Sequence, residues 1–263
     1  MTHVHVFTND LRLDDNTALN AIKFNFLLPV FILNDTRKSS ALHDKNDISL
    51  RGLKFMIQSL KDLNQAIQRR GGKLYVFRGS YKEVLSNIVA WIASPEITVS
   101  WNVTTGPVSA SMYEKLQEAA ASIDRLIAQI EDRTDGYLFK VEDCRQIRRT
   151  TFEQFRDRMS KYKPLRPVNL SQSHPDVTWI QLDPHLLVGN SSYVPVFEWN
   201  RIFNDAPHSS LNGGRMSGIN CLSRLQKFHT NFNVVADFPH RHAFPPIDAY
   251  MSSGCLSIRE GLH

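Results

Sequence analysis

The alternation of short apolar runs with helix-patterned segments in the first half of the chain constrains its fold most. Five runs predict β-strands: Val4–Phe7, Phe26–Leu33, Lys73–Phe77, Ile97–Trp101 and Leu126–Ile130. The four segments between them carry helical signals, most of them apolar residues at three- and four-residue spacing. Because parallel strands need a covering crossover, which is usually a helix, the pattern predicts an α/β fold with a five-stranded parallel doubly wound sheet over residues 1–136.

The predicted helix over residues 48–70 shows this periodicity most clearly. Its apolar stripe consists of Leu50, Leu53, Ile57, Leu60, Leu63 and Ile67, and it stops at Gly71 and Gly72. Glycine just past a basic last turn is a common helix end. The same reasoning predicts a helix over residues 81–92 and another that contains Met112, Leu116, Ala119 and Ile123. Trp91 and Trp101 are interpreted as core residues of this domain.

The pattern loosens after Gly136. Residues 137–209 are rich in proline and polar turns, and they predict a long interdomain connector with one helix over residues 150–162. Trp179 and Trp199 are interpreted as anchors that hold this connector. Residues 210–263 predict an incomplete α-helical region, with a helix carrying Ile219, Leu222, Leu225 and Phe228 and a short helix at Ser257–Leu262.

Composition points to an intracellular soluble protein. The chain is 42% hydrophobic and 22% charged, as is ordinary for globular proteins. No apolar run reaches the roughly 18 residues that a membrane span requires, and the start shows no secretory signal pattern. Cys144, Cys221 and Cys255 are odd in number and form no CxxC pair, which favours reduced thiols. We expect no membrane insertion and no secretion; cytoplasmic and organellar locations both stay open.

A mild basic bias leaves two interpretations open. The formal net charge is +5 and the sequence pI is about 9.1. The densest cluster comprises Arg145, Arg148, Arg149, Arg156, Arg158, Lys161, Lys163 and Arg166. A solvated helix face with its flanks is the favoured interpretation, and contact with RNA or DNA is the other.

Common catalytic and cofactor motifs are missing from the sequence. There is no GxGxxG after the first strand, and no P-loop, GxSxG or HExxH motif. His240-x-His242 supplies half a metal site without a third ligand at suitable spacing. We therefore predict no catalytic, cofactor-binding or metal residues, although a triad assembled in space stays open.

The loop from Thr8 to Asn16 follows the first strand, where an open parallel sheet usually places its ligand crevice. Asn9, Asp10 and Asn102 are polar residues at strand ends. Helix capping and turn formation is the favoured interpretation of all three, and contact with a pigment or nucleotide is the alternative. Leu11, Ala18 and Leu19 are expected to pack inward, with Asp15–Asn16 at the helix entry.

This opening loop resembles the signature of the DNA photolyase and cryptochrome family, W-F-R-x-D-L-R-x-x-D-N-x-A-L. Most positions match over Val6–Leu19. Further landmarks follow in family order: PVFILND, the block LKFMIQSLKDLNQAIQRRGGKLYVFRGS, Trp101-Asn102, Thr151-Phe152 with Phe155, Gly213-Gly214 with Leu222, Leu225 and Phe228, Asp237-Phe238-Pro239, and Gly254–Arg259. The resemblance implies a Rossmann-like domain that can hold an antenna pigment, a connector, and a helical FAD domain. The chain ends just after the first helices of that last domain, as in a truncated, degenerate member.

Departures from the family pattern concentrate at cofactor positions. The family segment T-S-x-L-S, which holds the flavin phosphates, falls on Phe244-Pro245-Pro246-Ile247-Asp248 and loses every hydroxyl. The tyrosine and arginine before D-F-P fall on Phe232 and Ala236, and the glutamate after the glycine pair falls on Arg215. On the antenna side the first-loop arginine is Thr8, and Y-E-P becomes Thr105-Gly106-Pro107.

The resemblance and its departures predict a photolyase-like protein that has lost flavin binding and light-driven chemistry. We expect no enzyme activity and no cofactor, and a structural or interaction role as a subunit of a larger assembly. Other protein subunits are the expected partners, and RNA or DNA bound through the basic segments is a further option. Leu222, Leu225, Phe228 and Leu256 are expected to be short of packing partners. The alternative is an FAD-dependent DNA photolyase or blue-light photoreceptor completed by a separate chain, with FAD as its cofactor.

Overall fold

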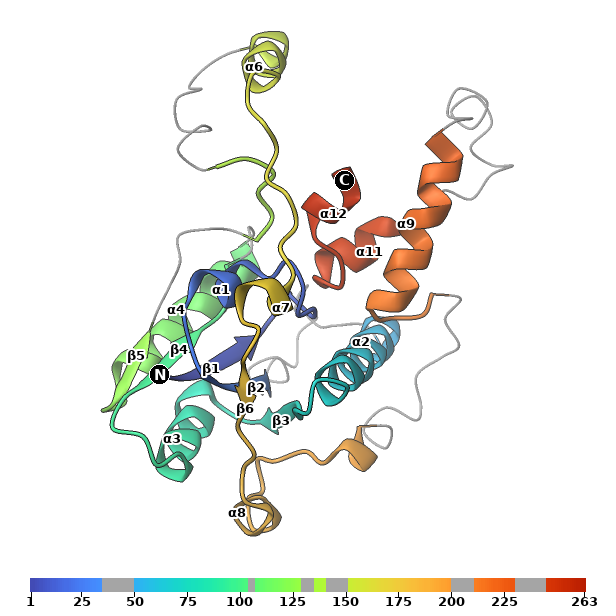
Figure 1. Ribbon diagram of the computed structural model, residues 1–263. Helices are drawn as coiled ribbons and strands as arrows, with labels where there is room; N and C mark the ends of the chain where they lie inside the picture. Colours follow the sequence, from blue (N-terminus) through green and yellow to red (C-terminus); the bar gives the residue numbers. More distant parts are fainter. Residues whose placement is uncertain (35–49, 104–106, 129–134, 141–150, 200–210, 230–244) are drawn as a thin grey trace.

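A computed structural model of the chain describes residues 1–34, 50–103, 107–128, 135–140, 151–199, 211–229 and 245–263. Its centre is a parallel sheet in the order β3-β2-β1-β4-β5, with β6 pairing to β2 (Figure 1). The strands are β1 (Thr2–Phe7), β2 (Phe26–Leu33), β3 (Tyr75–Arg78), β4 (Ile97–Ser100), β5 (Leu126–Ala128) and β6 (Thr178–Trp179). The five predicted strands and their parallel arrangement are confirmed.

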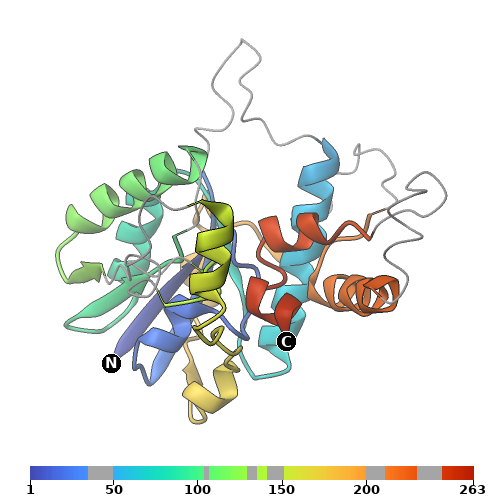
Figure 2. The ribbon, with the colours of Figure 1, turned by 90° about the horizontal axis from the view of Figure 1, so that it is seen from above.

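Helices cover both faces of this sheet (Figure 2). They are α1 (Thr17–Ala21), α2 (Leu50–Gln68), α3 (Tyr81–Trp91) and α4 (Pro107–Ala121). Val4 and Val6 of β1 belong to the core under α3 and α4, whereas Phe7 belongs to the core under α1 and α2. Successive strand residues point to opposite faces, so His3 and His5 share the face of Phe7. Trp101 lies fully inside the first core and Trp91 packs against it, as predicted.

The connector is more structured than predicted. Residues 137–209 contain α6 (Phe152–Met159), as expected, but also α7 (Leu170–Ser173), β6, α8 (Pro184–Val188) and the 3₁₀ helix η2 (Val196–Glu198). Tyr193 forms an antiparallel bridge with Phe77 of β3. The prediction of a single helix was wrong, because the additional helices are only 3–5 residues long and carry too little periodicity to be recognised, and β6 forms where β3 does not cover the start of β2. Trp179 and Trp199 are buried and anchor the connector, as predicted.

The C-terminal helices α9 (Arg215–His229), α11 (Ile247–Ser252) and α12 (Ile258–Leu262) pack beside α2 and the first loop (Figure 1). Leu256 is only 2% exposed, and Leu222 and Leu225 pack against the same core. The expectation that these leucines lack partners was therefore wrong: α2, α11 and the first loop supply the apolar surface. The side chain of Phe228 lies outside the described residues.

Close approach between α2 and α9 depends on the glycine pair before α9. The N–H of Gly213 donates to Gln58 Oε1 at 2.7 Å, and that of Gly214 donates to Ser59 Oγ at 2.9 Å. Asp62 Oδ2 accepts from the N–H of Arg215 at 2.6 Å. Side chains of α2 thus cap the start of α9 from outside the helix.

We expect Gly213→Ala to destabilise the fold by about 1–3 kcal/mol, as overpacking does. A β-carbon at Gly213 would lie 2.0 Å from the carbonyl oxygen of Phe55, so α9 would have to move away from α2. Gly189→Ala is the matched control, because a β-carbon there meets nothing within 4 Å. Urea denaturation of both variants measures the difference; an unchanged midpoint for Gly213→Ala would contradict the close-packing argument.

Candidate functional site

Asp10 lies at the centre of a buried polar network at the carboxyl end of β1. Its Oδ1 accepts the N–H of Thr8 at 2.7 Å, and its Oδ2 accepts from His5 Nε2 at 3.0 Å and from Asn102 Nδ2 at 2.7 Å. Burial alone would raise the pKa of this carboxyl, but the hydrogen bond and charge interaction with His5, with those from Thr8 and Asn102, hold the pKa below its ordinary value. Asp10 is thus a fully engaged structural carboxylate.

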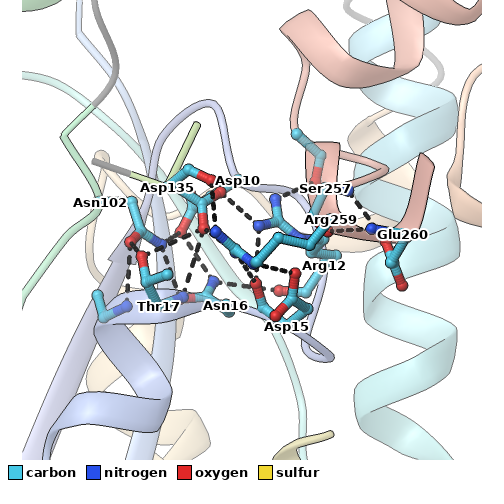
Figure 3. A network of polar contacts seen from close by, with 12 residues as sticks. Asp10, Arg12, Asp15, Asn16, Thr17, Asn102, Asp135, Ser257, Arg259 and Glu260 are labelled. Carbon is cyan, nitrogen blue, oxygen red and sulfur yellow. Dashed lines mark hydrogen bonds and ion pairs between the residues drawn. The ribbon is translucent and has the colours of Figure 1, made fainter. Parts of the chain in front are cut away.

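Two asparagines of this network cap helix α1. Asn16 is its N-cap and accepts from the N–H of Leu19 at 3.2 Å. Asn102, from the end of β4, accepts from the N–H of Ala18 at 3.0 Å and from Thr17 Oγ1 at 2.6 Å (Figure 3). These contacts agree with the capping and turn interpretation of Asp10 and Asn102, and Leu11, Ala18 and Leu19 pack inward as expected. Asn9 instead lines a cleft.

A serine, a histidine and a carboxylate meet in space although no sequence motif joins them. Ser100 Oγ lies 3.0 Å from His5 Nδ1, and His5 Nε2 lies 3.0 Å from Asp10 Oδ2. All three residues are 0% exposed, so no substrate can reach the hydroxyl. Ser100 also contacts His3 Nε2 at 2.9 Å. The group is a buried hydrogen-bond relay rather than a catalytic triad; the alternating histidines of the first strand were its sequence signal.

Four charged side chains join the first loop to the C-terminal segment (Figure 3). Arg259 is 2% exposed; its Nε binds Asp15 Oδ2 at 2.7 Å and its Nη1 binds the carbonyl of Asp135 at 3.1 Å. Arg12, 1% exposed, pairs with the Asp135 carboxylate and donates to the carbonyl of Gly254 at 3.0 Å. We call these four residues the ion-pair latch.

The positive and negative charges of the latch stabilise one another. Burial alone would lower the pKa of Arg12, but the charge of Asp135 and the hydrogen bond to it outweigh burial and raise the pKa. Two guanidinium groups and two carboxylates therefore balance one another out of water. Sequence reasoning noted Arg259 only as part of a landmark and missed Asp135, because their pairing spans more than a hundred residues.

Arg215 forms a second ion pair within the C-terminal region. Its Nη2 lies 2.5 Å from Glu260 Oε1 and its Nη1 lies 3.0 Å from Glu260 Oε2. Burial raises the pKa of Glu260, but the bidentate contact with Arg215 outweighs burial and lowers the pKa. Glu260 also forms a capping box with Ser257 at the start of α12.

A cleft of about 480 Å³ opens beside this network, at the carboxyl ends of β1 and β2 and between α2 and α11. Most of its wall is apolar and includes Phe7, Phe31, Phe55, Met56, Met112 and Leu211. Thr8, Asn9, Arg51, Ser252 and Ser253 add polar groups. A flat apolar molecule with a few polar atoms suits such a wall.

The segment that the resemblance aligns with flavin phosphates does not fit a phosphate. Pro245 and Pro246 have no N–H to donate, and the N–H of Ile247 donates to the carbonyl of Pro245 at 2.8 Å. Ile247 is buried, and Asp248 places a carboxylate in the first turn of α11. A phosphate would meet repulsion and few free donors here.

Several predicted positions lie outside the described residues: Thr105, Gly106, Cys144, Phe232, Ala236, His240, His242 and Phe244. Over the described part of the chain, no group of three histidine, cysteine or acidic side chains is placed to hold a metal ion. In that same part, every helix is too short or too polar to cross a bilayer.

A parallel doubly wound sheet with a helical segment fastened over its carboxyl ends defines a two-part protein of the α/β class, with a cleft where the parts meet. The family model described as DNA photolyase matches residues 3–172, and the chain therefore belongs to the DNA photolyase family. The predicted family and fold class are both confirmed.

Individual relatives agree with this assignment. Cryptochrome DASH of Idiomarina loihiensis is 24% identical over 269 residues, covering 97% of this chain and 54% of the relative. The (6-4)DNA photolyase of Arabidopsis thaliana is 31% identical over 85 residues, 30% of this chain and 15% of the relative. The archaeal photolyase of Sulfolobus tokodaii superposes with a TM-score of 0.72 at 22% identity, covering 99% of this chain and 54% of that structure. This chain thus spans about half the length of the first relative and of that structure, and the structural likeness shows the fold alone.

Proposed function

We propose that this chain is a DNA photolyase family protein that has lost flavin binding and light-driven chemistry. In this proposal it acts as a structural or interaction subunit of a larger assembly. The start of α11 carries this proposal. Residues that the resemblance aligns with the phosphate site serve packing instead: Pro246 is the N-cap, and Ile247 is buried in the core that α2 and the first loop share. With few free donors at Pro245–Asp248, this segment offers little to hold the pyrophosphate of FAD.

Arg215 supports the same proposal. It stands where the family has a glutamate, and its guanidinium is committed to Glu260 and to the carbonyl of Cys255 at 3.3 Å. The residue thus ties α9 to α12 and is occupied by protein groups. In this proposal the C-terminal region serves as a wall of the fold, and no enzymatic step is assigned to it.

The cleft favours a second candidate function, a flavoprotein of the photolyase or photoreceptor kind completed by a separate chain. The structure of the Sulfolobus tokodaii photolyase is described as containing two FAD molecules, with the implication of a novel light-harvesting cofactor. The apolar cleft at the ends of β1 and β2 has room and aromatic surface for a flat ring. In this candidate Phe55 and Met56 would hold the ring, and FAD would supply redox and light-absorbing chemistry.

An absorption spectrum tests the proposal. We expect the purified, unheated chain to show no flavin band after gel filtration, and added FAD to keep its free fluorescence. A stoichiometric flavin band that survives gel filtration would overturn the proposal in favour of the second candidate. In that event Met56→Trp, which fills the cleft, should reduce the bound flavin, whereas Gly189→Ala, at a position that does not line the cleft, should leave it unchanged.

A further inference from the structure

The helix α6 stands apart from the rest of the molecule (Figure 1). Every residue of it except Met159 is exposed, including Phe152 at 77% and Phe155 at 42%. An isolated eight-residue helix is unstable in water, and exposed aromatic rings add a further cost. Both rings belong to a landmark of the family resemblance, yet the described part of the fold leaves them largely open to water.

The chain segments before and after α6 form a stalk with two limbs that joins the helix to the rest of the fold. Its rising limb, residues 135–140, is held where Arg259 Nη1 donates to the carbonyl of Tyr137 at 3.0 Å. Its returning limb is fastened to the first loop, since Asp15 Oδ1 accepts from the N–H of Val168 at 3.1 Å. The limbs meet through the N–H of Leu165, which donates to the carbonyl of Leu138 at 2.7 Å. These contacts tie both limbs of the stalk to the body of the fold and to each other.

The side chains of α6 are sorted by face. Phe152, Phe155 and Met159 follow the i, i+3, i+7 spacing of a single stripe. Arg156 lies one turn from Phe152 and Arg158 nearly one turn from Phe155, which places a cation on each side of the stripe. Glu153 and Asp157, also one turn apart, occupy the opposite face. Three more exposed cations follow the helix: Lys161, Lys163 and Arg166.

We propose that α6 is a docking helix that inserts Phe152 and Phe155 into an apolar groove of a partner protein, with aspartate or glutamate side chains along the rim of that groove. The inference rests on the proposed role as an interaction subunit and names its surface. Aromatic anchors at helical spacing are the pattern of helix-in-groove recognition. Arg156 contacts the exposed Asp157 at 3.5 Å, a weak surface pair, so carboxylates on the rim of the groove would complement both flanking arginines. A groove that covers one face leaves Glu153 and Asp157 in water. A nucleic acid would also attract the cations, but it offers no groove matched to a helical apolar stripe.

Site-specific photo-crosslinking in cells tests the proposal. Benzoylphenylalanine replaces Phe152 in one full-length variant and Gln154, on another face of α6, in the control. We expect position 152 to form one predominant protein adduct, whose linked residue maps to an apolar groove bordered by acidic residues, and position 154 to form little of it. Equal adducts at both positions, a nuclease-sensitive adduct, or no adduct at position 152 would each overturn the proposal.

The partner protein that cross-linking identifies is then purified by itself, and its affinity for variants of this chain is measured. Phe152→Ala/Phe155→Ala should weaken its binding about 30-fold or more, the loss typical of an aromatic hot spot. Arg156→Glu/Arg158→Glu should weaken it too, whereas Gln154→Ala should not. Thermal unfolding of the variants should be unchanged because these side chains are exposed. If the double alanine variant binds the partner normally and the chain contains no flavin, the docking proposal is wrong and the proposed function stands. If the chain contains bound flavin, the proposed function is overturned instead.

Discussion

Arg259→Met will lower the free energy of unfolding by about 3–5 kcal/mol, the cost of leaving a buried charge uncompensated. The guanidinium of Arg259 binds Asp15 at 2.7 Å and reaches the carbonyls of Asp135 and Tyr137 at 3.1 Å and 3.0 Å. Methionine keeps most of the side-chain volume but leaves the Asp15 carboxylate buried without its main cation. Because the latch joins residues from three distant parts of the chain, its loss weakens the whole C-terminal region.

The controls for this prediction separate the latch from ordinary surface charge. Arg69→Met, at an exposed position just after α2, should change stability by less than about 0.5 kcal/mol. Asp15→Asn added to Arg259→Met should restore part of the loss, since it removes the unpaired carboxylate, and asparagine tolerates the positive φ of 53° at that position. Chemical denaturation measures all variants. Additive losses in the double variant would mean that Arg259 and Asp15 do not act together.

The strand–helix alternation was predictable because each apolar run and each helical stripe is a local signal. The order β3-β2-β1-β4-β5 was not predicted, because it depends on long-range pairing, as between Thr2 and Ile97. Strand β6 was not predictable in this way. Thr178 and Trp179 carry too short a signal, and they become a strand only because the backbone of Phe26 and Leu27 is free at the sheet edge.

The site was harder to predict, because its contacts join residues far apart in sequence. The capping of α1 by Asn16 is local and followed from the Asp15–Asn16 pair. The pairing of Arg259 with Asp15 spans 244 positions, and no spacing rule reaches that far. Leu256 illustrates the same limit, since its burial depends on a helix and a loop that the sequence places elsewhere. Local patterns identified the elements, and their docking decided which polar groups meet.

The buried histidine relay makes a second large prediction, because one of its ring nitrogens lacks a partner. Asp10, as a carboxylate, accepts from His5 Nε2, and His5 Nδ1 lies 3.0 Å from the hydroxyl of Ser100. The same hydroxyl lies 2.9 Å from His3 Nε2. His3 Nδ1 has no hydrogen-bond partner among the described residues, which suits a bare lone pair and not an N–H. Protonation of His3 would therefore place an N–H without an acceptor in the core.

The stability of the fold should consequently fall with acid below a pH of about 6.5. Burial, with the nearby charges of His5 and His174, lowers the pKa of His3 well below its ordinary value of 6.5. Below pH 6.5 the unfolded chain therefore binds a proton at His3 that the folded chain does not bind. The contribution of His3 to the free energy of unfolding is complete above that pH and declines as pH falls. The slope approaches about 1.4 kcal/mol per pH unit for one such proton. Asp10 and Glu260, whose pKa values are also lowered, contribute in the same sense, but only near and below their ordinary values of 3.8 and 4.5, outside the range in which His3 acts.

Replacing His3 isolates this effect. In His3→Phe the ring still stacks on Phe24, whose centroid lies 4.9 Å from that of His3, and the contact between Ser100 and His5 is kept. We expect the unfolding free energy of this variant to change much less between pH 7.5 and pH 5 than that of the wild type, measured by urea denaturation at constant ionic strength. His185→Phe, at an exposed position of α8, should keep the wild-type pH dependence. An equal slope in His3→Phe and wild type would place the titrating group elsewhere, whereas a flat profile in His3→Phe alone assigns the acid sensitivity of the fold to the amino-terminal end of the relay.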